Sequence, residues 1–133
     1  MTAKLIDGIK IAEKIISEIK DKVITNQSEG IAPPGLAVIQ VGGDPASSVY
    51  VRNKRKACEE VGMKSFNFDL GQSTTQKELI ELVESLNNNT EVNGILIQLP
   101  LPSHINETIV IETINPTKAV SYTHLTLPTN REV

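Results

Sequence analysis

The amino-acid sequence predicts an α/β fold, an open three-layer βαβ domain with a mostly parallel sheet. Short and nearly continuous apolar runs, typical of strands covered on both faces, occur at residues 36–41 and 94–98. Longer segments with apolar residues at helical spacing alternate with these runs. The length of 133 residues suits a single domain built around one core.

The first half of the chain supplies two helices around one strand. Residues 8–27 carry isoleucines, an alanine and a valine at helical spacing, which predicts a helix with one buried stripe. Glycines and prolines in residues 28–35 break this helix before the strand at 36–41. Asp44 and Pro45 then suit the cap and first turn of a second helix, expected from about Ser47 to Gly62.

The second half continues the alternation. A second strand is predicted at 65–70, and the hydroxyl residues at 73–75 can cap a third helix that ends near residues 87–89. The third strand, 94–98, is closed by a proline-containing loop. Residues 105–114 are weakly helical, and the chain turns at Asn115-Pro116.

Composition excludes several classes of protein. The formal net charge of −3 has the wrong sign for a nucleic-acid partner. One cysteine cannot close an intrachain disulfide, and His104 and His124 lie too far apart for a metal motif, so no metal is expected. The N-terminus lacks the apolar run of a signal peptide, and no stretch is apolar enough for a membrane span, so we expect a cytoplasmic protein without a membrane partner.

Ligands of open parallel sheets bind beyond the carboxyl ends of the strands. Two segments of this sequence qualify, residues 42–56 after the first strand and residues 98–102 after the third. The sequence around Gly42-Gly43 fits neither the dinucleotide fingerprint nor the phosphate-binding loop. We therefore expect no nucleotide site in these segments.

The second predicted helix places one lysine on an otherwise largely apolar side. At about 100° per residue, Lys54 lies opposite a charged arc, and Tyr50 precedes it by one turn. An apolar wall disfavours the charged form of an amine, which suits an acid–base group at neutral pH. Alternatively, Lys54 extends from the stripe to water. The charged arc contains Arg52, Arg55, Lys56, Glu59 and Glu60, and the apolar arc contains Ser47, Tyr50, Ala57, Cys58 and Val61.

Gln98 ends a buried strand and so points towards the presumed site. Pro100 and Pro102 stiffen the loop that follows and remove two backbone donors. An ordinary rigid turn at a strand end is the alternative interpretation. Cys58 is expected to be a small core residue, and His104 has no evident partner and is given no role.

Three segments carry a resemblance to a known family. They closely resemble the bifunctional methylenetetrahydrofolate dehydrogenase/methenyltetrahydrofolate cyclohydrolase family, in order and at family spacing, and the likeness covers about residues 1–118. Residues 6–8 and 41–47 are also similar. The three segments are Ser47-Ser48-Val49-Tyr50-Val51-Arg52-Asn53-Lys54, Gln98-Leu99-Pro100-Leu101-Pro102 and Ile114-Asn115-Pro116-Thr117-Lys118.

The resemblance implies a parent enzyme that oxidises 5,10-methylenetetrahydrofolate with NADP and hydrolyses 5,10-methenyltetrahydrofolate to 10-formyltetrahydrofolate. It implies that Lys54 is the catalytic acid–base residue, that Gln98 tunes it and that Tyr50 stacks on the folate. Ser47 would support this network, and Leu99 and Pro100 would contact the substrate. The full-length family is further expected to form a homodimer.

The sequence departs from the family after Lys118. The family continues Asp-Val-Asp-Gly, whose second acid helps to hold the pterin, whereas Ala119 and Ser121 replace both acids here. Residues 1–118 are therefore expected to be the folate-binding catalytic domain, and residues 119–133 a non-family tail that resembles translated sequencing-adapter read-through. The NADP-binding domain of the family has no counterpart in the sequence, which suggests a truncated reading frame.

These departures lead us to expect no dehydrogenase activity and a weakened cyclohydrolase. Loss of one wall of the cleft removes positioning, which alone can cost orders of magnitude in rate. The alternative is a non-catalytic α/β binding or interaction module. That alternative predicts Lys54 in solvent, away from Tyr50 and Gln98.

Overall fold

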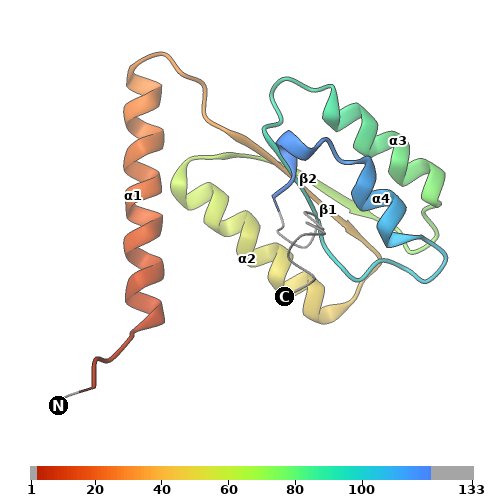
Figure 1. Cartoon of the computed structure of the whole chain (residues 1–133), viewed down its shortest axis with the longest axis horizontal. Coiled ribbons are helices and arrows are strands. Elements are labelled where there is room, and N and C mark those ends of the chain that lie inside the picture. Colours follow the sequence, from red (N-terminus) through yellow and green to blue (C-terminus); the bar gives the residue numbers. More distant parts are fainter. Residues whose placement is uncertain (1–2, 121–133) are drawn as a thin grey trace, which may run out of the picture.

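The computed structural model describes residues 3–120, and its elements confirm the predicted alternation of helices and strands (Figure 1). The predicted tail therefore lies outside the described residues from residue 121 onwards. The elements are α1 (Gly8–Ser28), β1 (Gly35–Val41), α2 (Pro45–Val61), β2 (Lys64–Leu70), α3 (Gln76–Asn87), β3 (Gly94–Ile97), α4 (Glu107–Thr113) and the 3₁₀ turn η1 (Pro116–Lys118).

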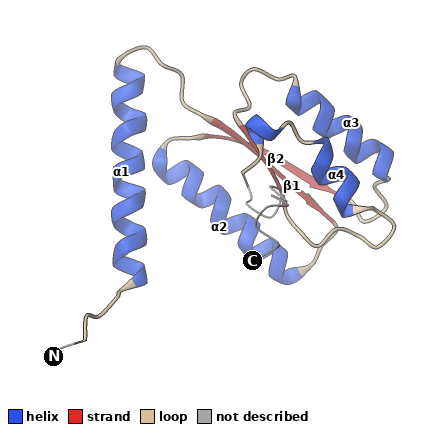
Figure 2. Cartoon of the chain, viewed as in Figure 1, coloured by secondary structure: helices blue, strands red, loops and turns tan. Residues whose placement is uncertain are grey.

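The three strands form one parallel sheet in the order β2-β1-β3, as predicted for βαβ units. Helix α2 covers one face of the sheet, while α3 and α4 cover the other, which gives the three expected layers (Figure 2). β1 is the central strand and β3 is an edge strand. The outer edge of β3, which makes a single bridge to Ala119, borders a pocket between the two helical layers.

Alternation of side chains along the strands divides the core between the two faces. Ala37, Ile39 and Val41 belong to the larger cluster with α3 and α4, whereas Val38 packs with Val51 of α2. Full burial of such side chains contributes about 1.5–3 kcal/mol each. The same alternation directs residues 40 and 98 towards α2. Fully buried large side chains are Ile39, Leu79, Ile95, Val38, Val51, Val83, Val92 and Val110.

The ends of α2 confirm the predicted start and stop signals. The Asp44 carboxylate accepts a hydrogen bond from Ser47 N at 2.9 Å, and Pro45 occupies the first turn. The hydrogen bond from the Ser47 backbone N–H lowers the pKa of Asp44. Gly62 ends the helix with a φ of 82°, a left-handed conformation that favours glycine. These caps set the two ends of the helix that carries Lys54.

The prediction that α1 buries one stripe of apolar residues is wrong for most of the helix. Val23 is the one buried residue of α1, whereas Ile9 is 74% exposed and Ile15 is 49% exposed. Helix α1 packs mainly against α2 and lies to one side of the sheet (Figure 1). Apolar periodicity therefore identified the helix but not what covers it. No helix among residues 3–120 is long and apolar enough to cross a bilayer.

Candidate active site

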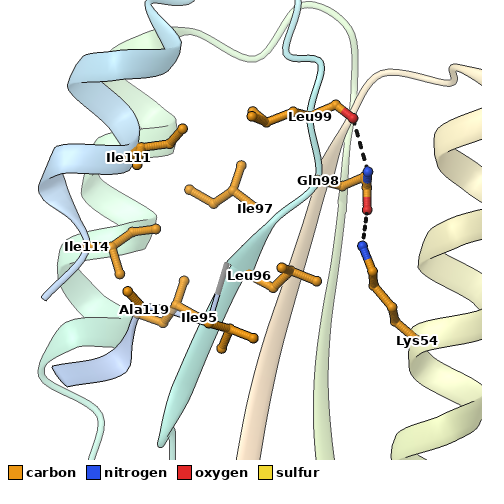
Figure 3. Close-up of a pocket in the computed structure, with 10 residues that line it drawn as sticks. Lys54, Ile95, Leu96, Ile97, Gln98, Leu99, Ile111, Ile114 and Ala119 are labelled. Carbon is orange, nitrogen blue, oxygen red and sulfur yellow. Dashed lines mark hydrogen bonds between the residues drawn. The ribbon is translucent and has the colours of Figure 1, made fainter. Parts of the chain in front are cut away.

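A pocket of about 230 Å³ lies along the open edge of β3, between α2 on one side and α4 with the chain that follows it on the other. Figure 3 shows Lys54 reaching towards Gln98 from α2, with Ile111 and Ile114 on the opposite side. The walls are mostly apolar, and of the described residues that line them Lys54 alone is ionisable. The lining residues are Lys54, Ile95, Leu96, Ile97, Gln98, Leu99, Ile111, Ile114, Ala119 and Val120.

Lys54 and Gln98 meet directly. Lys54 Nζ donates a hydrogen bond of 2.7 Å to Gln98 Oε1 (Figure 3). Gln98 follows the last residue of β3 and shares the α2 side of the sheet with Leu96. Lys54 is half-buried on the face of α2 that also carries the buried Val51 and Cys58. Strand alternation and helix rotation thus bring together two residues that are 44 positions apart in sequence.

The orientation of the Gln98 carboxamide follows from its other contact. Gln98 Nε2 donates to the backbone oxygen of Leu99 at 3.0 Å, and Ser47 Oγ donates to the same oxygen at 3.4 Å. A carboxamide has one donor end and one acceptor end. Because the donor end is held by Leu99, the acceptor end faces Lys54. Ser47, Gln98 and Leu99 therefore form one network that presents the lysine amine to an apolar pocket.

Such an arrangement suits proton transfer. A lysine amine can donate or accept a proton, and a neighbouring acceptor fixes its position without adding a charge. Pockets that bind small molecules combine apolar walls with a few placed polar groups. The site therefore has the composition of a small-molecule pocket with one acid–base group.

Tyr50 and Pro100 lie outside this network. Tyr50 stands one turn before Lys54 on α2, is 57% exposed and is not among the described lining residues. The predicted apolar arc included Tyr50 and omitted Val51, and this is wrong, because Val51 is only 1% exposed. Compared with the predicted arc, the buried side of α2 is turned towards β2. Tyr50 therefore lies at the exposed edge of that side. Pro100 is exposed and follows Leu99 through a cis peptide bond.

Arg55 was placed on the solvated arc, and this prediction is also wrong. Its guanidinium makes a bidentate ion pair with Asp69 of β2, at 2.6 and 3.1 Å, and its side chain is 21% exposed. Hydrogen bonding from Arg55 lowers the pKa of the Asp69 carboxyl. The predicted arc could not include this pair because its acid lies on another element.

Cys58 is buried, as predicted, and burial together with the nearby Glu59 carboxylate raises the pKa of its thiol.

His104 was expected to lack a partner, but its Nε2 lies 2.8 Å from the backbone oxygen of Thr74. This contact ties the loop after β3 to the start of α3, so His104 has a structural partner.

The sequence pattern did not predict the contact that Gln40 makes with α2. Gln40 is 8% exposed, and its Nε2 donates to Ser48 Oγ at 3.0 Å, which in turn donates to the backbone oxygen of Asp44. The available signal was a polar glutamine near the carboxyl end of an apolar strand, on the same face of the sheet as Gln98. The pocket wall from Ile111 and Ile114 was also missed, because helix α4 has too little periodicity to show which face it buries.

The start of α2 does not fit the pyrophosphate of a dinucleotide. Dinucleotide folds place the pyrophosphate on free N–H groups at the start of the helix after the first strand. Here the Asp44 carboxylate occupies the start of α2 and Pro45 supplies no N–H. Within residues 3–120 there is also no group of three or more His, Cys, Asp or Glu side chains placed to hold a metal.

The sequence pattern of the tetrahydrofolate dehydrogenase/cyclohydrolase catalytic domain matches residues 6–121. This chain belongs to that family. The resemblance in the three quoted segments is thereby confirmed at the level of the family, and the fold agrees with it.

Relatives of this family are considerably longer than this chain. The bifunctional protein FolD of Legionella pneumophila strain Philadelphia 1 is 52% identical over 124 residues, which are 93% of this chain and 44% of that protein. The Campylobacter jejuni FolD structure is 46% identical with a TM-score of 0.81, over 85% of this chain and 40% of that one. The Trypanosoma brucei enzyme, solved with NADP and an inhibitor, is 35% identical with a TM-score of 0.82, over 89% of this chain and 40% of that one. This chain thus spans less than half the length of the relatives.

Proposed function

We propose that this chain binds a tetrahydrofolate derivative at the β3 edge and that Lys54 acts on its one-carbon unit. The single observation behind the proposal is the 2.7 Å contact between Lys54 Nζ and Gln98 Oε1 in a mostly apolar pocket. Membership of the family gives the substrate class. Residues 1–118 are accordingly proposed to be a folate-binding catalytic domain.

The proposed reaction is hydrolysis of 5,10-methenyltetrahydrofolate to 10-formyltetrahydrofolate. Water attacks the methenyl carbon and Lys54 accepts the proton that the water loses, acting as general base. The bond between that carbon and N5 then breaks, N5 takes the proton from Lys54, and the hydroxyl proton passes to solvent as the formyl group forms. Gln98 holds the amine in place during both transfers.

The size of the pocket constrains how a folate is bound. Typical ligand pockets measure about 300–1,000 Å³, whereas this pocket measures about 230 Å³, so only part of the ligand enters it. Tyr50 is proposed to stack on the remainder, since its exposed ring lies one turn from Lys54. Leu99 and Pro100 are proposed to contribute the adjoining surface, and the buried Ser47 is proposed to support them through its hydrogen bond to Leu99 O.

We propose that residues 3–120 by themselves do not reduce NADP. The capped start of α2 is unsuited to a pyrophosphate, which supports placing the hydride-acceptor site for oxidation of 5,10-methylenetetrahydrofolate outside these residues. The related Trypanosoma brucei enzyme was solved with NADP. A homodimer of the full-length protein and a cytoplasmic location remain predictions.

Binding and hydrolysis of 5,10-methenyltetrahydrofolate by the purified chain test this proposal. Lys54→Ala should abolish hydrolysis and weaken binding, because the acid–base group is lost. Lys56→Ala is the matched control, since Lys56 is an exposed lysine on the same helix. Equal rates and affinities in the two variants would overturn the proposal.

A further inference from the structure

The chain that follows α4 is tied to the carboxyl end of α3 by two side chains. Asn87 Nδ2 donates to Thr113 O at 2.8 Å, and Asn87 Oδ1 accepts from Asn115 N at 2.9 Å. Lys118 Nζ donates to Leu86 O at 3.0 Å and to Asn89 O at 2.8 Å. We call Asn87 and Lys118 the α3 clamp.

Physical chemistry favours a lysine at this place. The last carbonyl groups of a helix lack partners within the helix and carry its negative partial charge. Lys118 is half-buried and donates to one carbonyl in the last turn of α3 and to one just beyond it. None of the ion pairs among residues 3–120 involves Lys118. Its ammonium is therefore directed to α3 and not to a carboxylate.

The hydrogen bonds of the α3 clamp hold the chain next to residues that form the pocket wall. Ile114 lies between Thr113 and Asn115 and lines the pocket. Directly after Lys118, Ala119 forms a parallel bridge with Ile95, and Ala119 also lines the pocket. Figure 3 shows Ile114 and Ala119 on the side of the pocket opposite Lys54. The clamp thus holds the chain on both sides of Ile114 and directly before Ala119.

Val120 brings this wall up to Gly94 of β3, while 51% of the Val120 surface stays exposed. A Cβ on Gly94 would lie 2.8 Å from Val120 Cγ2, so Val120 sits where only glycine leaves room for it. Val120 is the last described residue and also lines the pocket. A shift of the chain after Lys118 would therefore change the shape of the pocket directly.

We infer that Asn87 and Lys118 are positioning residues for the pocket, which fix the wall formed by Ile114, Ala119 and Val120 without contacting the ligand. This inference rests on the proposed function, because it concerns the same pocket. The clamp sets affinity by shaping the wall, while Lys54 and Gln98 stand on the other side and keep their own contacts.

The test compares Lys118→Met, Asn87→Ala and Lys118→Arg with Asn88→Ala in the whole chain. Asn88 is the matched control, since its Nδ2 donates to Glu84 O at the same end of α3 and, among the described residues, its side chain makes no hydrogen bond to the chain after α4. Three quantities are measured: NMR amide signals and hydrogen exchange of residues 114–120, urea unfolding, and the dissociation constant for 5-formyltetrahydrofolate, a stable reduced folate.

We expect Lys118→Met and Asn87→Ala to move the signals of residues 114–120, speed their exchange and weaken binding roughly tenfold, about 1.4 kcal/mol. Lys118→Arg should keep the wild-type signals, exchange rates and affinity, because a guanidinium can still donate to the two carbonyls. Asn88→Ala should keep wild-type affinity even where it lowers unfolding stability. Wild-type affinity in Lys118→Met, or an equal loss in Asn88→Ala, would overturn the inference.

The two proposals fail in distinguishable ways. If the wild-type chain does not bind the probe, the proposed function fails, and the clamp is judged on the ligand-independent signals alone. Unchanged signals and exchange at residues 114–120 in both clamp variants would then overturn the clamp as well.

Discussion

Gln40 and Gln98 lie at the carboxyl ends of adjacent parallel strands on the same face of the sheet, and each hydrogen-bonds a side chain of α2. Gln98 N donates to Ile39 O at 2.9 Å, which places the two glutamines side by side. Gln40 reaches Ser48 at 3.0 Å, and Gln98 accepts from Lys54 at 2.7 Å. The pair fixes α2 over the carboxyl edge of the sheet at two points, of which only one faces the pocket.

Because only Gln98 faces the pocket, replacement by leucine should have different effects at the two glutamines. Gln98→Leu removes the acceptor of Lys54, so we expect hydrolysis of 5,10-methenyltetrahydrofolate to fall about 100-fold, the lower range for acid–base catalysis. Gln40→Leu removes only the Ser48 contact and should alter stability by about 1 kcal/mol while the rate stays within a few-fold of wild type. Rate assays and urea unfolding of both variants check this, and similar rates in the two would contradict it.

The left-handed end of α2 predicts a cost for a side chain there. Gly62 has a φ of 82°, and a Cβ would lie 3.4 Å from Val23 Cγ1, an ordinary contact. Gly62→Ala should therefore lower the free energy of unfolding by about 1–2 kcal/mol through backbone strain alone. Urea unfolding measures this, with Gly43→Ala as control, because Gly43 has open space and no positive φ. Equal losses in the two variants would count against the explanation.

The ion pair between Arg55 and Asp69 predicts a pH dependence of stability. Arg55 lowers the pKa of Asp69 in the folded state, whereas the unfolded value is about 3.9. The contribution is therefore present above about pH 4 and is lost as the pH falls through the folded pKa. Because Asp69 is largely exposed, Asp69→Asn should lower stability at pH 7 by less than about 1 kcal/mol.

Unfolding curves of the wild type and Asp69→Asn across acid pH check the sign of this effect. The two stabilities should converge as the pH falls below the folded pKa of Asp69. A difference that persists undiminished into strong acid would show that the effect does not come from the carboxylate.

The exposed isoleucines of α1 predict apolar dye binding and self-association by this chain. Ile11 and Ile15 are 48% and 49% exposed on neighbouring turns of the same face. Ile15→Glu should reduce fluorescence of an apolar dye and the apparent mass at high concentration. Ser17→Glu, on the polar side of the helix, is the control and should leave both unchanged. The same reduction in both variants would point to net charge as the cause.

Local signals predicted much of this molecule. The Asp44-Pro45 start and the Gly62 end of α2, and the β-strand patterns, determine the fold through backbone preferences that act over a few residues. Helix rotation and strand alternation also favoured a common site for Lys54 and Gln98, and their hydrogen bond decides against the alternative of a lysine extended into water. Such features depend on each element by itself.

Contacts between elements were harder to predict. The pattern of α2 has a broad apolar side, and only packing on the sheet decides that Val51 is buried and Tyr50 is exposed. Arg55 looked solvated because its partner Asp69 lies on β2. The apolar spacing of α1 likewise predicted a helix but did not show what the helix packs against. In all three cases the outcome depends on contacts with other elements.

NMR observation of the Lys54 side-chain amine during titration with a reduced folate is the most direct test of the central claim. We predict that the Lys54 resonance moves saturably with added 5-formyltetrahydrofolate, that the Gln98 carboxamide signals move with it, and that the Lys56 resonance does not. Saturable binding that leaves the Lys54 and Gln98 signals unchanged would contradict the claim that this pair forms the folate site.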